Sequence, residues 1–363
     1  MTQPAERLAQ VEALRGIAAL LVVWLHVTEL FVQQPKMAGP GFWLFEVARL
    51  FDFGRIGVAL FFAISGFVIC SSIKGSAWHF VLRRLFRLYP AFWLSVAAGL
   101  YFVWGGWQPP VTDPMVLANI TMLPAALGQP AVLGLYWTLE TELVFYSLCL
   151  LLFLTGRVRN PLVYLVISVL LVALAAFFQM SDSWRPALSQ WRSMPYHLSI
   201  MFWGASFRVF FDNKNSGLSF KRYFLSMQSL LLAHTLVVVL PAVWLYLSDL
   251  LTNAETAFRA GIPYLVALAV FYFGCRAELL RNRVLVWFGT ISYSLYLFHP
   301  VVLHGVNSWL MASGPPVLLS NLFLYLIVIL LASTIVAAVS YYLVESPIIS
   351  LSKRLSSSLR DSR

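Results

Sequence analysis

Long apolar runs alternate with short polar connections along the whole chain. Ten of the runs reach the roughly 17–25 residues that a membrane-spanning helix requires. They are residues 14–32, 56–73, 85–104, 136–155, 161–179, 195–211, 224–248, 258–274, 284–305 and 317–344. Because a helix satisfies its own backbone hydrogen bonds in lipid, the pattern predicts an all-α, polytopic transmembrane helix bundle of about ten helices.

The ninth run is the least regular of the ten. Gly289, His299 and Pro300 interrupt its apolar sequence. Non-helical backbone at membrane depth is tolerated where it lines a cavity. The sequence therefore leaves two forms open for this helix, a continuous span or one that is broken or re-entrant around a cavity.

The composition agrees with burial in a membrane. The 363-residue chain is 60% hydrophobic and 11% charged, whereas soluble domains average about 45–50% apolar and about 25% charged residues. The three cysteines form no CxxC pair, so we expect neither a disulfide nor a metal site. Residues 1–13 contain acidic groups and lead to no cleavage site, so the first run is expected to remain as a helix. We predict one transmembrane domain, residues 1–350, and a short basic cytoplasmic tail, residues 351–363.

Basic residues are concentrated in alternate connections. Arg83, Arg84 and Arg87 (the arginine cluster) follow the second run, and further Lys or Arg residues follow the fourth, sixth, eighth and tenth runs. Residues 105–135 and 306–316 contain none. Since cytoplasmic loops are enriched in Lys and Arg, both termini are predicted to be cytoplasmic. The same distribution explains the formal net charge of +10 without a nucleic-acid partner.

Arg15 and His26 are titratable groups inside the first apolar run. Such groups are costly in hydrocarbon, so they suggest a functional role. Eleven positions at ~100° per residue return to nearly the same helix face, and the two residues lie about 16 Å apart along the axis. One face would then carry a cation near the cytoplasmic surface and an imidazole in the outer half of the membrane. The alternative is a snorkelling arginine with a histidine satisfied by a neighbouring helix.

Three carboxylates also fall in or near apolar runs. Glu140 and Glu142 lie two positions apart near the outer start of the fourth run, so they point to different sides of that helix. Glu29 follows His26 by about one turn and is placed to orient its imidazole. The alternative to a functional role is that each carboxylate is solvated at the outer interface of the membrane. This alternative applies less to Glu142, which is expected to lie deeper in the membrane.

The arginine cluster suits a phosphate clamp, because each guanidinium can bind oxygens bidentately. Arg84 and Arg87 are three positions apart and share a helix face. The positive-inside bias alone also explains arginines in this connection.

Tyr293 and Tyr296 lie on turns close to His299 and are expected to line the same polar cavity. The remaining histidines without an evident partner are interpreted as structural, namely His79, His197 and His234. The chain contains no GxxxxGK[ST], GxGxxG, HExxH or GxSxG motif and no His-x4-Asp pair. These absences argue against ATP-driven transport, zinc proteolysis and α/β-hydrolase chemistry.

Six stretches, in order, resemble the acyltransferase 3 family of integral-membrane acyltransferases. They are Arg15-x10-His26, GVALFFAISGF, RRLFRLYP, WTLETELVFY, ISYSLYLFHP and SYYLVESP, spread over about residues 10 to 348. The resemblance implies a protein of the bacterial cytoplasmic (inner) membrane. It also implies transfer of an acyl group, usually acetyl, from cytoplasmic acyl-CoA to an extracytoplasmic glycan or glycolipid. By position, it assigns functional roles to Arg15, His26, the arginine cluster, Glu142 and Glu345.

These features combine into one predicted mechanism. The phosphates of acetyl-CoA bind the arginine cluster with help from Arg15, and the pantetheine arm extends along the first helix. His26, an imidazole that titrates near neutrality, acts as the general base for a sugar hydroxyl. Glu142 or Glu29 holds the imidazole of His26 in the tautomer that can accept this hydroxyl proton. No metal is expected.

Two alternatives come from other classes of protein. Buried Arg, His and Glu also occur in proton-coupled transport, so a transporter or flippase for a glycan, lipid or organic anion is the main rival. The two halves of the chain show no inverted repeat, which argues against it. A structural subunit of a polysaccharide export complex is the third interpretation.

Overall fold

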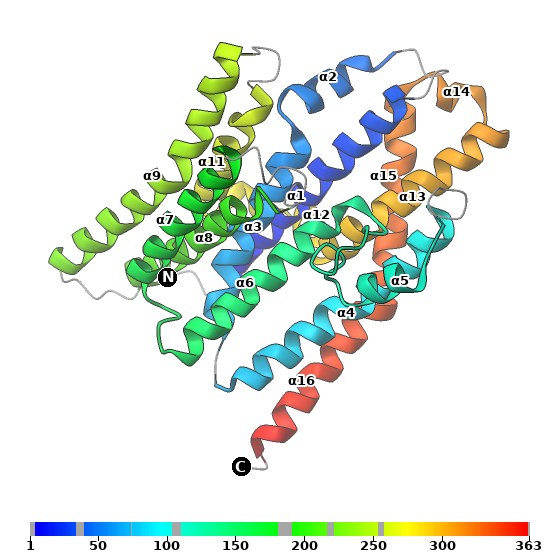
Figure 1. Ribbon diagram of the computed structural model, residues 1–363. Helices are drawn as coiled ribbons and strands as arrows, with labels where there is room; N and C mark the ends of the chain where they lie inside the picture. Colours follow the sequence, from blue (N-terminus) through cyan, green and yellow to red (C-terminus); the bar gives the residue numbers. More distant parts are fainter. Residues whose placement is uncertain are drawn as a thin grey trace. The chain divides into compact units, whose positions relative to one another are not determined.

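A computed structural model describes residues 4–33, 40–73, 75–103, 110–180, 191–215, 221–252 and 258–361. The last two residues of the predicted tail lie outside these ranges. Within them, all regular elements are helices (Figure 1). The chain divides into two compact units. Unit 1 comprises Met1–Gly57, Trp78–Trp137 and Arg276–Arg363, and unit 2 comprises Val58–Ala77 and Thr138–Cys275.

Unit 1 is built around α1 (Pro4–Gln33). This helix packs against α12 (Arg283–Thr290), α13 (Ser292–Ser313) and α15 (Leu322–Ser340), and α13 and α15 also pack on each other. The other helices of the unit are α2 (Phe42–Leu50), α4 (Ala77–Phe102), α5 (Asp113–Ile120), η1 (Gly134–Tyr136), η3 (Glu278–Arg281) and α14 (Pro316–Leu319). Because α1 has neighbours on several sides, it can hold Arg15 and His26 against other helices of this unit.

Local sequence explains where several of these helices begin. The side chain of Asn282 accepts hydrogen bonds from the backbone N–H groups at the start of α12, and Asn321 does the same for α15. Such N-caps satisfy donors that have no partner within the helix. The amide side chains therefore set these two starting points.

The ninth apolar run forms α12 and α13, which meet at an angle of 70°. The run is thus broken, which is one of the two forms that its sequence left open. At the bend, the hydroxyl of Thr290 donates to the Val286 carbonyl at 3.1 Å, and that of Ser292 donates to the Gly289 carbonyl at 2.7 Å. These hydroxyl groups supply hydrogen bonds where the backbone ladder is interrupted. Pro300 lies farther along, inside α13, and does not end that helix.

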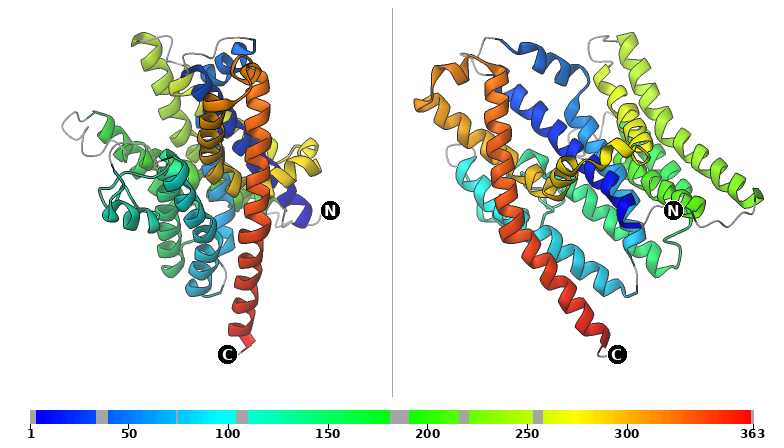
Figure 2. Two further views of the ribbon diagram at one scale, coloured as in Figure 1. Left: turned by 90° about the vertical axis from the view of Figure 1, so that its right-hand side faces the viewer. Right: turned by 180° about the vertical axis from the view of Figure 1, so that it is seen from behind.

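Helix α15 continues through a π-helical turn, η4 (Tyr341–Glu345), into α16 (Ser346–Asp361). Figure 2 shows the three segments as one long rod. Short π-helical turns inside α-helices are frequent at functional sites. This turn buries the side chain of Glu345 within unit 1.

Glycines allow the close crossing of α1 and α12. A methyl group on Gly16 would lie 2.6 Å from the Leu285 carbonyl oxygen, and one on Gly289 would meet the carbonyl of Glu12. Backbone atoms cannot move aside as a flexible side chain can. The small residues therefore set the distance between these helices.

We expect Gly289→Ala to lower the apparent melting temperature in detergent, because overpacking a helix crossing costs about 1–3 kcal/mol. Gly305→Ala is the matched control on α13, since its added methyl would meet only the Phe102 ring, at 3.8 Å. This control should leave stability unchanged or raise it slightly through better helix propensity. Equal melting temperatures for the two variants would contradict the role given to Gly289.

Unit 2 is built around α8 (Met194–Asn215). This helix packs against α7 (Pro161–Met180) and α9 (Lys221–Thr252), and α9 also contacts α11 (Ile262–Gly274). The unit further contains most of α3 (Phe53–Ser72) and of α6 (Trp137–Leu154). Helices α3 and α8 approach closely, because methyl groups on Gly66 and Gly204 would meet the carbonyls of Met201 and Ala63.

Two of the histidines interpreted as structural have partners inside unit 2. His234 is fully buried, with Nδ1 2.8 Å from the Ser206 hydroxyl and Nε2 2.7 Å from the Ser168 hydroxyl. His197 Nε2 lies 3.1 Å from the Tyr264 hydroxyl. These contacts join neighbouring helices and agree with a structural role.

By length and composition, seven helices in the described parts of the chain can cross a membrane, or eight if the bent pair α12–α13 is one span. The all-α prediction holds for the described residues, and the protein is a multi-pass integral membrane protein. The expected runs 195–211 and 258–274 form α8 and α11, but α11 has only 13 residues and α8 is not apolar enough to count as a span. Helix α8 is largely buried among its neighbours, so its outward faces need not match lipid.

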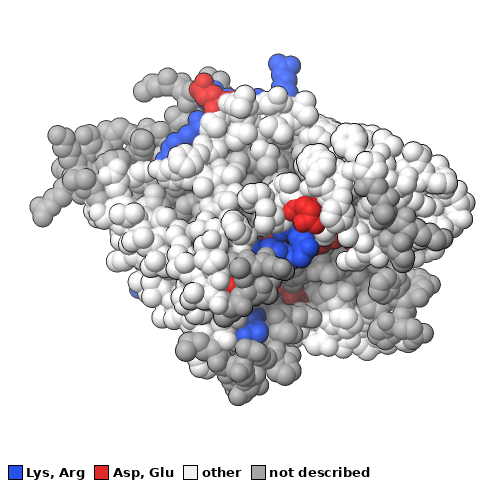
Figure 3. Space-filling view, turned by 90° about the horizontal axis from the view of Figure 1, so that it is seen from above, with Lys and Arg blue, Asp and Glu red and all other residues white. Residues whose placement is uncertain are grey.

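The surface agrees with immersion in lipid. In Figure 3, most of the described surface on the face shown carries no Lys, Arg, Asp or Glu. Large aliphatic side chains stand outward instead, such as Leu170, Leu240 and Val339, which are 64%, 59% and 52% exposed. Exposed apolar surface on this scale needs a nonaqueous partner.

Candidate active site

His26 on α1 and His299 on α13 form a hydrogen-bonded pair in unit 1. Nδ1 of His26 lies 2.9 Å from Nε2 of His299, and the ring planes differ by 10°. His299 is fully buried, whereas His26 is half-buried. Nδ1 of His299 lies 3.2 Å from the carbonyl oxygen of Leu295, one turn earlier on α13. The two imidazoles thus continue a hydrogen-bonded chain that starts at the backbone of α13.

Glu345 stands at the centre of a second polar group in unit 1. Its side chain is buried, and it accepts a hydrogen bond from the hydroxyl of Ser294 on α13. The charges of Arg87 on α4 and Arg15 on α1 both act on this carboxylate. Arg15 also pairs with Glu12 at 3.4 Å. Two of the arginines predicted to bind the donor therefore influence one buried carboxylate through their charge.

Arg15 and His26 have different kinds of partner. Arg15 acts on a carboxylate that Ser294 binds, and His26 binds His299 directly. Ser294 and His299 both belong to α13. His26 thus contacts α13 directly, whereas Arg15 pairs with Glu12 on its own helix and acts on Glu345 through its charge.

The other members of the arginine cluster are half-buried on the first turns of α4. Nε of Arg83 donates to the carbonyl of His79 at 3.2 Å, and the guanidinium of Arg84 lies 5.4 Å from the centre of the Phe80 ring. Nε of Arg84 is enclosed by protein, so this side chain is only partly accessible.

Tyr293 and Tyr296 join α13 to neighbouring segments. The hydroxyl of Tyr293 donates to the Leu88 carbonyl on α4 at 2.8 Å, and that of Tyr296 donates to the Leu135 carbonyl in η1 at 3.3 Å. The Tyr296 ring lies 6.0 Å from that of His299. The two tyrosines expected to line a cavity thus also hold α13 in position beside the histidine pair.

Glu142 and Glu140 lie in unit 2 and have different surroundings. Glu142 is half-buried and accepts hydrogen bonds from Ser65 at 3.0 Å and from Tyr146 at 2.5 Å. Glu140 is only 2% exposed and is therefore buried within unit 2. Glu29 is half-buried on α1.

Sequence reasoning missed Asp52 and Ser294. Asp52 is buried in the turn before α3, adopts φ 46°, and accepts the backbone N–H of Arg55 at 3.0 Å. Its charge acts on His26. A carboxylate just before a predicted helix start is an N-cap signal, but that signal says nothing about a histidine on another helix. Ser294 resembles any small polar residue of a helix until its partner Glu345 is known.

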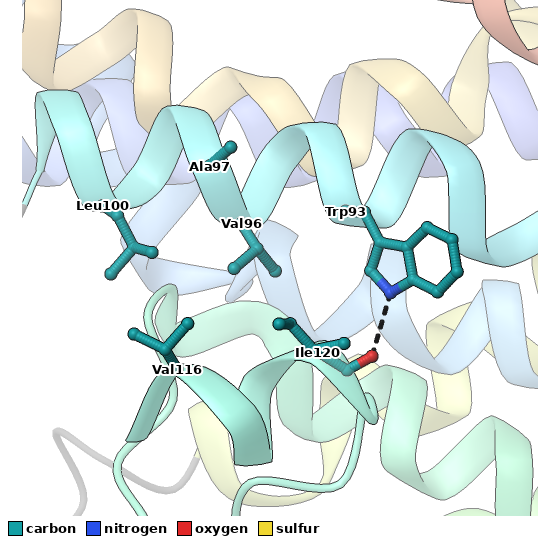
Figure 4. A pocket seen from close by; sticks show the side chains of 6 residues that line it. All are labelled: Trp93, Val96, Ala97, Leu100, Val116 and Ile120. Atoms are coloured by element: carbon teal, nitrogen blue, oxygen red, sulfur yellow. Dashed lines mark hydrogen bonds between the residues drawn. The ribbon is translucent and has the colours of Figure 1, made fainter. Parts of the chain in front are cut away.

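An apolar cavity of about 390 Å³ lies between α4 and α5 (Figure 4). Trp93, Val96 and Leu100 of α4 face Val116 and Ile120 of α5 across it, and the Trp93 indole donates to the Ile120 carbonyl at 2.9 Å. Its lining residues carry no ionisable group. This cavity suits an apolar chain rather than a catalytic centre.

The histidine pair does not form part of a metal centre among the described residues, where no three His, Cys, Asp or Glu side chains come together as ligands. Two imidazoles that bind each other use nitrogen atoms that a metal would need. The pair is therefore described as two hydrogen-bonded imidazoles.

Comparison with known proteins agrees with these features. The sequence model of a family described as an acyltransferase domain matches residues 8–342, which is nearly the whole chain. The protein thus belongs to a class of membrane-embedded acyltransferases. More specifically, it is a member of the acyltransferase 3 family.

Curated relatives are distant but cover most of the chain. "Nodulation protein 10" of Rhizobium leguminosarum bv. viciae is 26% identical over 373 aligned positions, covering 94% of this chain and 93% of the relative. "Putative acetyltransferase ORF330" of Acidianus two-tailed virus is 24% identical over 297 positions, covering 81% and 82%. No solved structure matches the chain.

Proposed function

We propose that this protein is a membrane O-acyltransferase that moves an acetyl group from cytoplasmic acetyl-CoA to a hydroxyl of an extracytoplasmic glycan or glycolipid. The observation that carries the proposal is the location of Arg15 and His26. Both lie on α1 of an acyltransferase 3 protein; His26 binds His299 of α13, and the charge of Arg15 acts on the buried Glu345. The acetyltransferase named among the relatives supports acetyl as the group transferred.

The donor is held by its phosphates in this proposal. The half-buried guanidiniums of the arginine cluster bind the phosphates of CoA, since Arg forms bidentate hydrogen bonds with phosphate oxygens. Arg15 extends this basic surface onto α1. With both termini cytoplasmic, as the distribution of Lys and Arg predicts, these arginines face the compartment that contains acetyl-CoA. The membrane is then the bacterial cytoplasmic membrane.

His26 acts as the general base. Its imidazole takes the proton from the acceptor hydroxyl while the oxygen attacks the thioester carbonyl. A C–O bond forms and the C–S bond breaks. The CoA thiolate leaves and takes the proton from the imidazolium. The products are free CoA and the acetyl ester of the acceptor, so His26 returns to its starting state.

The proposal is tested with purified protein in liposomes, labelled acetyl-CoA and, as acceptor pool, glycolipid and polysaccharide extracted from bacterial membranes. We expect release of free CoA thiol together with transfer of label into the carbohydrate fraction. Uptake of label without thiol release would show a transporter or flippase instead. Absence of both signals in all extracts would favour a structural subunit.

A further inference from the structure

The hydrogen bonds of the histidine pair have a fixed direction. A carbonyl oxygen only accepts, so the bond between the Leu295 carbonyl and Nδ1 of His299 requires the proton to be on Nδ1. Pro300 adds to this arrangement. Because proline has no N–H, the carbonyl of Tyr296 lacks its usual helical donor and is a second backbone acceptor for His299. The backbone of α13 thus holds His299 as the Nδ1–H tautomer.

The other nitrogen of His299 must then accept. His299 is fully buried in unit 1, where an unpaired charged imidazolium would be costly. In the neutral ring, Nε2 carries a lone pair and no proton. The 2.9 Å contact therefore runs from Nδ1–H of His26 to Nε2 of His299.

His26 is left with its basic nitrogen available. With the proton on Nδ1, its lone pair is on Nε2. Nε2 of His26 has no hydrogen-bond partner in the described parts of the chain and is not among the enclosed unpaired nitrogens. A free imidazole prefers the opposite tautomer, with the proton on Nε2. The protein thus needs a partner to hold His26 in the less common form, as the bond made by one nitrogen decides the state of the other.

We propose that His299 is a positioning residue, which fixes the tautomer and orientation of His26 so that Nε2 faces the acceptor hydroxyl. This inference rests on the proposed function of His26 as general base. When Nε2 takes the proton from the acceptor, the bond from Nδ1–H to His299 becomes charge-assisted and therefore stronger. His299 stabilises the imidazolium in the way a carboxylate does in other general-base pairs, but without adding a negative charge.

This proposal changes the role expected of the carboxylates. Since Nδ1 of His26 is already bonded to His299, Glu29 or Glu142 could approach only Nε2. A carboxylate bound there would occupy the base. We therefore assign the orientation of His26 to His299 rather than to Glu142, which accepts hydrogen bonds from Ser65 and Tyr146.

The test combines three variants with two readouts. His299→Leu removes the acceptor for Nδ1–H of His26. His299→Gln can keep an acceptor, because the amide oxygen of glutamine extends about as far from the backbone as Nε2 of histidine. His304→Gln is the matched control, since it makes the same change on α13 outside the pair. The readouts are the kinetics of CoA release and the nitrogen-15 NMR signals of labelled histidines. The chain has six histidines, and the His26 signals are assigned by their loss in His26→Gln.

We expect His299→Leu to lower kcat by about 100-fold or more with little change in KM for acetyl-CoA, a loss in the range of general-base catalysis. The kcat of His299→Gln should remain within about tenfold of the wild-type value, and the kcat of His304→Gln should equal the wild-type value. His26 should carry its proton on Nδ1 in the wild type and in His299→Gln, and should shift toward Nε2–H in His299→Leu.

Two results would overturn the inference. One is a wild-type His26 protonated on Nε2, which does not depend on any variant folding. The other is a folded His299→Leu that keeps the wild-type kcat. The proposed function fails differently, through absence of CoA release from the wild type in every acceptor extract. The NMR signals would still report the tautomer in that case.

Discussion

His26→Gln is expected to lower kcat for acetyl transfer by about 100-fold to 10,000-fold, because a positioned base contributes about this much to proton transfer. Glutamine keeps a polar side chain of similar size but cannot take a proton near neutral pH. Binding of acetyl-CoA should be retained, since the residues proposed to hold its phosphates are unchanged. The measurement is the rate of CoA release in liposomes, together with the equilibrium affinity for acetyl-CoA.

His304→Gln serves as the control for folding and insertion, as above. A His26→Gln protein that inserts normally and keeps the wild-type rate would show that His26 is not the base. A protein that loses donor affinity as well as rate would point instead to a structural role for the histidine pair. The two outcomes are separated by measuring affinity and rate on the same preparation.

Arg87→Gln should raise KM for acetyl-CoA at least tenfold. Hydrogen bonds to charged groups contribute about 1.5–3 kcal/mol, and ~1.4 kcal/mol corresponds to a factor of ten. S-acetylpantetheine carries the same thioester without phosphates, so its KM should be nearly the same in the variant and the wild type. Added salt should raise KM for acetyl-CoA more in the wild type than in the variant, because salt screens a phosphate contact that the variant lacks.

Arg49→Gln is the matched control for this substitution. Arg49 lies in the last turn of α2, is exposed, and has its guanidinium 5.9 Å from the Phe45 ring. It should leave KM unchanged for both substrates. If Arg87→Gln changed KM equally for acetyl-CoA and S-acetylpantetheine, Arg87 would act by balancing the buried charge of Glu345 rather than by binding phosphate.

Local sequence predicted the helices well, because the cost of exposing backbone polar groups to lipid acts on each apolar run by itself. Each of the ten runs corresponds to a helix or to the bent pair α12–α13. The polar residues of the ninth run left both a continuous and a broken helix open, and the structure decided for the broken one. Whether α8 and α11 span a membrane could not be predicted from local sequence, because it depends on the helices packed around them. Burial of α8 within unit 2 removes the requirement that it be apolar on all sides.

The candidate site was only partly predictable. Sequence spacing identified Arg15 and His26 as residues of one helix face, since helix periodicity depends on the chain alone. It also placed His299 near a cavity, but not opposite His26, which is 273 positions away. The partners of Glu142, Ser65 and Tyr146, were likewise not predictable, because periodicity gives a direction around a helix and not what lies there.

The sequence by itself therefore determined that this is an all-α membrane acyltransferase with costly polar groups on its first helix. These properties follow from composition, apolar run length and ordered motifs. Only the tertiary structure decided that His26 binds His299 and that Arg15 and Arg87 both act on Glu345. Such pairings depend on which helix faces meet, and close crossings at Gly16 and Gly289 help to set this. No local pattern contains that information, because each partner lies on a different helix.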